Sequence, residues 1–257
     1  MPLRYQRTIH HLACTGGTII SKCLSVMPNT ILLSEINPLN LYGSYFCPSN
    51  PFLAFQVAYG KPLGIEAYRE NFISQIQLIR KICDRDNKSL IIRDHAQHDF
   101  FSRHPSQCCD VKTPVRQFLE DYFQLLSALT VRHPLDSYLS FRKNCELYDE
   151  KIFTLEEYCK CYRNFLNEYA GITIFKYEDF CRDTIDFMER LSSCLQLEFD
   201  VDCLKRFGLA RVSGDSGRAS NLEIRLRERR VVPWDVDQER MSGCHYQMLL
   251  QALDYQD

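Results

Sequence analysis

The sequence predicts an α/β fold with three layers, α/β/α, around a central parallel sheet of about five strands. Short apolar runs typical of strands occur at residues 8–14, 30–34, 89–93, 125–131 and 172–176, and segments with helical periodicity separate them. With 257 residues, of which 45% are hydrophobic, the chain is long enough to bury one sizeable core. We therefore expect a single domain over residues 1–257.

Two of the predicted helices have clear sequence limits. Residues 65–83 place apolar side chains at steps of three and four, which predicts one long amphipathic helix. A second helix opens at Thr154, where the sequence has the form of a capping box, and ends before Gly171. Residues 36–62 contain four prolines and many aromatic residues. We interpret them as a long ordered loop that covers an acceptor site, or alternatively as a satellite core.

A pair of glycines joins the first strand to the helical pattern that follows it. The helix is expected to begin near Thr18, with Gly16 and Gly17 at its start. Free amide groups and the positive end of the helix dipole favour an anion at such a place. The alternative is a turn that uses glycine for steric reasons alone. The Walker pattern is absent, which argues against a nucleoside triphosphatase or kinase.

A second candidate phosphate contact follows the apolar run 125–131. Arg132 is expected at the carboxyl end of that buried strand, where open α/β sheets bind ligands. Pro134 and Asp136 suit the first turn of the next helix, and Ser140 lies about two turns into it. A guanidinium matches phosphate oxygens well, so Arg132 and Ser140 predict a phosphate clamp. The alternative is that Arg132 pairs with Asp136 and Ser140 is only solvated.

A third marker is the strand-like segment 172–180, which ends in Lys176, Tyr177, Glu178 and Asp179. With these three motifs in this order, over residues 8–220, the chain resembles the sulfotransferase family. The resemblance implies a P-loop-like fold and 3′-phosphoadenosine 5′-phosphosulfate (PAPS) as the sulfuryl donor. It also implies two sets of cofactor-binding residues: the loop Thr15, Gly16, Gly17, Thr18 and Ile19 for the 5′-phosphosulfate, and Arg132 with Ser140 for the 3′-phosphate.

The resemblance extends to a late loop and includes one departure. Ser216, Gly217 and Arg218 resemble the family's glycine-bearing loop over the 3′-phosphate, although an ordinary turn is the alternative. Many relatives carry Lys or Arg where this chain has Thr15. Lys22 lies one turn beyond Thr18 on the same helix face, so we expect it to supply the missing positive charge. The alternative is a solvated surface lysine.

Sulfuryl transfer also requires a group that takes the proton of the acceptor hydroxyl. Glu35 follows the second strand, and the resemblance to sulfotransferases with a glutamate base there makes it the first candidate. His95 and His98 follow the third strand, where cytosolic sulfotransferases carry a catalytic histidine. Ordinary structural pairing is the alternative for all three. His10 and His11 fall within the first predicted strand and are interpreted as packing residues.

The charge and composition of the chain indicate which partners, metal sites and cellular location to expect. The net charge of −2 argues against broad nucleic-acid binding. The arginines of segment 225–230 are expected either on a solvated face or over an anionic cofactor. The 13 cysteines lack paired spacing, so we expect reduced thiols and no metal site. No apolar run has the length of a signal peptide core or a membrane span, which predicts a cytoplasmic protein.

The sequence thus predicts a sulfotransferase that uses PAPS and a hydroxyl acceptor, either a carbohydrate or a small metabolite. Two other functions remain open. One is a small-molecule kinase of P-loop-like fold. The other is a catalytically silent nucleotide-binding module that retains the clamp but lacks the cation at Thr15.

Overall fold

The computed structural model describes residues 4–39, 51–61, 63–101, 113–144, 153–214 and 224–257. Within this part of the chain, no helix is both long and apolar enough to cross a lipid bilayer. The elements follow one another as β1 (Arg4–His10), α1 (Gly17–Ser25), β2 (Thr30–Ile36), α2 (Pro51–Tyr59), α3 (Ile65–Arg85), β3 (Ser89–Asp94), α4 (Ala96–Phe100), α5 (Pro114–Glu120), β4 (Phe123–Val131), α6 (Pro134–Asn144), α7 (Leu155–Glu168), β5 (Thr173–Lys176), α8 (Tyr177–Arg182), α9 (Thr184–Cys194), α10 (Cys203–Arg206), the 3₁₀ turn η2 (Phe207–Leu209), α11 (Trp234–Ser242) and α12 (Cys244–Leu253).

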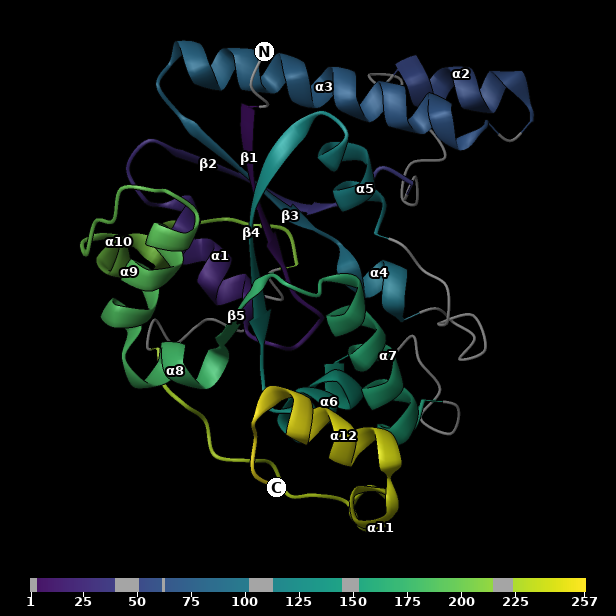
Figure 1. Ribbon diagram of the computed structural model, residues 1–257, viewed down its shortest axis with the longest axis vertical. Coiled ribbons are helices and arrows are strands. Elements are labelled where there is room, and N and C mark those ends of the chain that lie inside the picture. The colour runs from purple at the N-terminus through teal and green to yellow at the C-terminus, as the bar shows by residue number, and fades with distance from the viewer. Residues whose placement is uncertain (1–3, 40–50, 62, 102–112, 145–152, 215–223) are drawn as a thin grey trace.

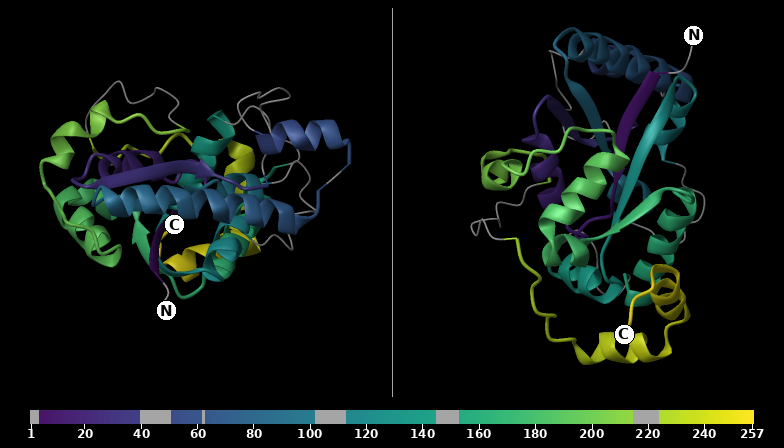
Figure 2. Two further views of the ribbon diagram at one scale, coloured as in Figure 1. Left: turned by 90° about the horizontal axis from the view of Figure 1, so that it is seen from above. Right: turned by 60° about the vertical axis from the view of Figure 1, so that its left-hand side comes forward.

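The five strands form one parallel sheet in the order β2-β3-β1-β4-β5, with β1 at its centre (Figure 1). Helices cover both faces of the sheet (Figure 2). The predicted three-layer α/β/α fold with about five parallel strands is therefore confirmed. Because all strands run the same way, the loops after β1, β2, β3 and β4 meet at one edge of the sheet.

Successive strand residues supply two separate cores, since their side chains alternate between the faces of the sheet. Ile9, Ile91 and Ala128 pack with α1, α8 and α9 on one face. Ile92 and Phe123 pack with α3 and α5 on the other. Parallel strands buried on both faces are typical of this class of fold.

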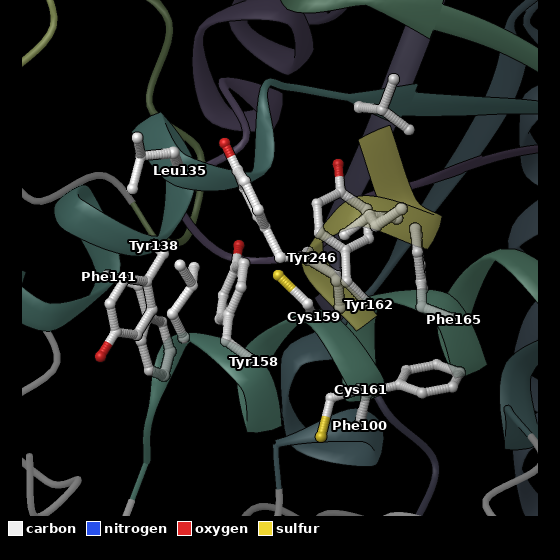
Figure 3. Close-up of a cluster of buried hydrophobic side chains, with 14 of the residues drawn as sticks. Phe100, Leu135, Tyr138, Phe141, Tyr158, Cys159, Cys161, Tyr162, Phe165 and Tyr246 are labelled. Atoms are coloured by element: carbon white, nitrogen blue, oxygen red, sulfur yellow. The ribbon is translucent and has the colours of Figure 1, made fainter. Parts of the chain in front are cut away.

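A third apolar cluster lies between α4, α6, α7 and α12 and is rich in aromatic rings (Figure 3). Tyr158, Tyr162 and Phe165 line one side of α7 and are fully buried. The rings of Tyr158 and Tyr162 meet edge to face with centroids 5.9 Å apart, an arrangement that aromatic quadrupoles favour. This cluster fixes α7 beneath the carboxyl ends of β1 and β4.

Two predicted boundaries are wrong. The first strand was expected at 8–14, but β1 ends at His10 because the chain turns away from the sheet and Cys14 adopts a left-handed φ of 64°. The segment 36–62 was expected to be a loop, yet residues 51–59 form α2. Pro51 stands at the first position of that helix, where its missing N–H costs no hydrogen bond. Residues 40–50 lie outside the described part.

The long amphipathic helix and the helix opened by Thr154 are both confirmed, as α3 and α7. The Thr154 hydroxyl accepts the N–H of Glu157 at 3.2 Å, as a capping box requires. The reciprocal half is not formed, because the buried Oε2 of Glu157 has no hydrogen-bond partner. The cap of α7 is instead completed by a residue distant in sequence, Glu239 of α11, which accepts the N–H of Leu155 at 2.6 Å.

Glu156 of α7 makes the same kind of contact with the start of the helix that follows α11, which is α12. Its two carboxylate oxygens accept the N–H groups of His245 and Tyr246 at 2.8 and 3.3 Å, at the start of α12. A carboxylate at a helix N-terminus satisfies free amides and interacts favourably with the helix dipole. Helices α7, α11 and α12 therefore hold one another through exchanged N-terminal caps.

This exchange predicts a specific pattern of stability. Glu239→Ala and Glu156→Ala should each lower the free energy of unfolding by about 1.5–3 kcal/mol, because each leaves amides without a charged acceptor. Glu157→Ala is the matched control on the same helix turn and should change it by less than about 0.5 kcal/mol. The measurement is denaturant unfolding followed by circular dichroism. Equal effects from all three variants would contradict the exchanged caps.

Candidate functional site

A cavity of about 360 Å³ opens at the carboxyl edge of the sheet. The loops after β1, β3 and β4 contribute to its wall, and β2 contributes Glu35 near its end, as the position of the edge requires. In the part of the chain that the structure describes, five cationic and two acidic side chains line it: Lys22, Arg93, Arg132, Arg225 and Arg227, and Glu35 and Asp94. The excess of positive charge favours an anionic ligand.

The turn from β1 into α1 forms the floor of this cavity. Gly16 is the N-cap residue of α1, with φ of 85°, and no side chain caps the helix. A Cβ on Gly16 would lie 2.0 Å from the ring of Tyr177, and one on Gly17 would lie 2.2 Å from the ring of His11. Only glycine fits at either position. Gly16, Gly17, Thr18 and Ile19 all line the cavity, so the uncapped end of α1 faces it.

Thr15 lies differently from the four residues that follow it. Its side chain is fully buried, and its hydroxyl donates to the carbonyl oxygen of Leu12 at 2.7 Å. Thr15 is absent from the cavity lining, whereas Cys14 is part of it. The Thr15 side chain therefore shapes the loop from within.

Lys22 is 5% exposed and lines the cavity, so the alternative of a solvated surface lysine is wrong. It lies in the same helix whose N-terminus faces the cavity. A lysine stem packed in this way carries its ammonium group toward the polar opening.

Arg132 follows β4 directly, as predicted. Neighbouring residues contact both its backbone and its side chain. The hydroxyl of Tyr162 accepts the Arg132 N–H at 3.0 Å and donates to its carbonyl oxygen at 3.2 Å, which ties Arg132 to the aromatic cluster of Figure 3. Nη1 donates to the carbonyl oxygen of Cys14 at 3.2 Å, and the guanidinium lies 5.2 Å above the ring of Tyr177. Its buried Nε has no partner. Ser140, in α6, lines the same cavity.

Among the described residues, Arg132 does not pair with Asp136, which was the alternative to the phosphate clamp. Asp136 accepts from Nε of Arg229 at 3.0 Å, in the segment that follows residue 223. Within the same segment Arg225 and Arg227 line the cavity. The basic run is exposed to solvent, and two of its arginines also line the cavity, so both alternatives describe part of it. Ser216, Gly217 and Arg218 lie outside the described residues.

Glu35 lies where β2 departs from regular pairing with β3. The register shifts between Leu33 and Ile36, and Glu35 takes a left-handed φ of 56°. Such a bulge turns a side chain toward a new direction. Oε1 of Glu35 accepts from Nη2 of Arg93 at 2.9 Å, and both residues line the cavity.

Arg93 is the buried member of this pair, with its side chain 3% exposed. Its Nε and Nη1 have no hydrogen-bond partner. Burial lowers the pKa of Arg93 from its ordinary value, while the charges of Glu35 and Asp94 oppose that shift. Gly214 covers the pair so closely that a Cβ there would lie 2.0 Å from Oε1 of Glu35. The turn is fastened to β2 by Ser213, whose hydroxyl donates to the carbonyl of Ser34 at 2.8 Å.

The two candidate histidines are not equivalent. His95 lines the cavity at the start of α4, whereas His98 is exposed and lies outside its lining. Their rings stack with centroids 6.0 Å apart. The structure thus brings Glu35 and His95 to one cavity with Lys22, and leaves His98 beside it.

The interpretation of His10 and His11 as packing residues holds only for His10, which is fully buried and stacks on Tyr169. His11 lines the cavity, and its buried Nδ1 has no partner. Burial, and after it the charge of Arg93, hold the pKa of His11 well below its ordinary value, so the ring is neutral. His11 directly follows β1, and Arg93 is the last residue but one of β3, so both reach the cavity at the edge of the sheet. A correct prediction of these two strand ends would have identified both as cavity residues.

No protein-family model matches the sequence, and no curated protein matches it. Solved structures do. The sulfotransferase domain of the Synechococcus olefin synthase has a TM-score of 0.61 and 17% identity, with 99% of this chain and 96% of that one covered. The sulfotransferase domain of the curacin biosynthetic pathway has a TM-score of 0.58 and 15% identity, with coverage of 100% and 99%.

A sulfotransferase from Mycobacterium avium is similar to all of this chain over 78% of its own length, with a TM-score of 0.55 and 11% identity. Three structures are therefore similar to this chain over nearly its whole length. At these identities the similarity concerns the fold. The chain has the fold of the sulfotransferases.

Proposed function

We propose that the protein transfers a sulfuryl group from PAPS to a hydroxyl acceptor, a carbohydrate or a small metabolite. One observation carries this proposal: a helix N-terminus without a cap and five cationic side chains share one cavity at the sheet edge of a sulfotransferase fold. A donor with phosphate and phosphosulfate groups at opposite ends matches cations that are spread across that cavity.

The 3′-phosphate would bind at the β4 end of the cavity. Arg132 presents a guanidinium whose Nε is buried without a partner, and Ser140 adds a hydroxyl from α6. Arg225 and Arg227 line the same cavity and extend the positive surface. The 5′-phosphosulfate would then lie over Gly16, Gly17, Thr18 and Ile19, where the α1 amides supply donors without a net charge of their own.

Transfer would proceed by attack of the acceptor oxygen on sulfur, as the bond from sulfur to the 5′-phosphate oxygen breaks. Negative charge develops on the departing phosphate, and Lys22 at the α1 end of the cavity can stabilise it. The acceptor proton passes to Glu35, whose Oε2 remains available because Oε1 is held by Arg93. Arg93 fixes the direction of that carboxylate and adds positive charge next to the sulfuryl group. His95 is the alternative base.

The first prediction concerns the nucleotide. Thermal stabilisation by 3′,5′-adenosine bisphosphate should exceed that by ATP, because ATP lacks a 3′-phosphate for Arg132 and Ser140. Arg132→Ala should weaken bisphosphate binding by about ten- to a hundredfold, the effect of about 1.5–3 kcal/mol lost with a charged hydrogen bond. Arg190→Ala, an exposed arginine paired with Asp186, is the control. Equal stabilisation by ATP and bisphosphate would refute the cofactor.

The second prediction separates an enzyme from a silent binding module. Lys22→Ala should slow transfer strongly and change bisphosphate affinity little, because that product no longer carries the sulfuryl group. Lys22→Arg should retain part of the rate, and Lys81→Ala, on the exposed side of α3, should change nothing. Rates come from transfer of labelled sulfate, and affinities from calorimetry. Tight bisphosphate binding without any turnover in the unmodified protein would favour the silent module.

The third prediction identifies the base. Glu35→Gln preserves size and can still accept from Arg93, but it cannot take the proton, so turnover should fall by about 10²–10⁴ while bisphosphate affinity stays unchanged. His95→Asn and His98→Asn should each cost far less. All three variants are compared with one acceptor. An active Glu35→Gln together with an inactive His95→Asn would transfer the role to the histidine.

A further inference from the structure

A chain of buried polar side chains crosses the sheet and ends at the cavity. Thr8 and His10 lie on the same face of the central strand β1, and both are fully buried. The Thr8 hydroxyl is 2.8 Å from that of Ser127 on β4 and 2.9 Å from Nε2 of His10. Nδ1 of His10 lies 2.7 Å from Oδ2 of Asp94, at the end of β3. Each of these buried polar groups has a hydrogen-bond partner, as burial requires.

Asp94 is held from two sides by this chain. Besides His10, the hydroxyl of Tyr169 donates to the same oxygen, Oδ2. Tyr169 stacks on His10 with ring centroids 4.2 Å apart, so the two donors are themselves packed together. A carboxylate fixed through two hydrogen bonds to one oxygen has a defined orientation.

The other oxygen of Asp94 has no such partner. Oδ1 is buried and makes no hydrogen bond, although Asp94 is 2% exposed and lines the cavity. A buried carboxylate oxygen without a donor costs free energy, which a bound N–H or O–H group would recover. The contacts through His10 and Tyr169 therefore fix Asp94, a residue of the cavity lining, with one acceptor atom that has no donor among the described residues.

The position of Asp94 relates this acceptor atom to the proposed chemistry. Asp94 is paired in register with Ile36, next to Glu35 on the neighbouring strand. It also follows Arg93, whose Nε and Nη1 have no partner. Of the residues that the structure describes, five cationic and two acidic side chains line the cavity, so its overall charge favours a neutral hydroxyl over an ammonium group as the donor to Asp94.

We propose that Asp94 accepts a hydrogen bond from a second hydroxyl of the acceptor, close to the hydroxyl that is sulfated. The acceptor class is then a polyol or sugar with neighbouring hydroxyls, rather than an isolated alcohol or an amino alcohol. This inference rests on the proposed sulfotransferase function. Asp94 would act on specificity, and Glu35 would remain the base.

The test compares matched acceptors with labelled PAPS: cyclohexane-1,2-diol against cyclohexanol and 2-aminocyclohexanol, and methyl glucoside against its monodeoxy analogues. kcat/KM should be about ten- to a hundredfold higher for the diol than for cyclohexanol, as expected for one hydrogen bond to a charged group. It should be higher by the same factor for methyl glucoside than for the monodeoxy analogue that lacks the hydroxyl bound by Asp94. Preference for cyclohexanol or for the amino alcohol would overturn the proposal.

The decisive variant is Asp94→Asn. His10 and Tyr169 both donate to Oδ2, so the amide must keep its oxygen there and turn its NH₂ toward the cavity, which replaces the acceptor atom by a donor. The preference for the diol should disappear, while the rate with cyclohexanol changes less than about threefold and bisphosphate affinity is retained. An unchanged preference would overturn the role of Asp94.

Asp99→Asn is the matched control. Asp99 belongs to α4, accepts from Asn37 at 2.8 Å and is absent from the cavity lining. Burial raises the pKa of Asp99 to about 7. This variant should keep the preference for the diol.

Binding provides a second measurement if none of these probes is sulfated. Methyl glucoside should raise the melting temperature of the bisphosphate complex of the unmodified protein and should fail to do so with Asp94→Asn. No shift in either protein would overturn the inference. Failure of the sulfotransferase proposal gives a different result: either the bisphosphate does not bind, or it binds and no acceptor, cyclohexanol included, is sulfated.

Discussion

The close approach of α1 to the sheet edge is the constraint on which the cavity depends. Two glycines allow it, since the rings of Tyr177 and His11 occupy the space where side chains at Gly16 and Gly17 would stand. Tyr177 in turn lies under the guanidinium of Arg132, and His11 lies beside Arg93. A single turn thus sets the distance between the α1 amides and both cationic regions. Any side chain at Gly16 would also have to adopt a left-handed φ, at a cost of about 1–2 kcal/mol.

Burial of charge distinguishes the two ends of the cavity. At the β3 end Arg93 is almost completely buried and pairs with the carboxylate of Glu35, whose side chain is 25% exposed. Arg225 and Arg227, in contrast, line the cavity from an exposed segment. Electrostatic interactions are stronger where water is excluded. In the proposed reaction, the β3 end would stabilise charge that appears only during transfer, and the exposed arginines would bind charge that enters and leaves with the nucleotide.

Much of this architecture follows from sequence pattern. Strand order and layers come from apolar periodicity, and Arg132 and the glycine turn could be located because each stands at the limit of an apolar run. What failed has physical reasons. The predicted end of β1 lies four residues beyond the observed one, because the apolar Leu12 and Ala13 continue the strand pattern past His10. His11 was therefore interpreted as a packing residue, although it lines the cavity. Asp94 and Arg93 escaped notice because their roles come from partners on other strands.

The exchanged caps have a consequence for the order in which the nascent chain acquires its structure. Glu239 leaves the ribosome 84 residues after Leu155, the residue whose amide it satisfies. At about 5–20 residues per second this interval lasts on the order of ten seconds. During translation the start of α7 therefore lacks its acceptor, and Tyr162, which anchors the Arg132 backbone, belongs to that helix. Arg132, at the carboxyl edge of the sheet, therefore gains its fixed position only late in synthesis, after the five strands have already emerged.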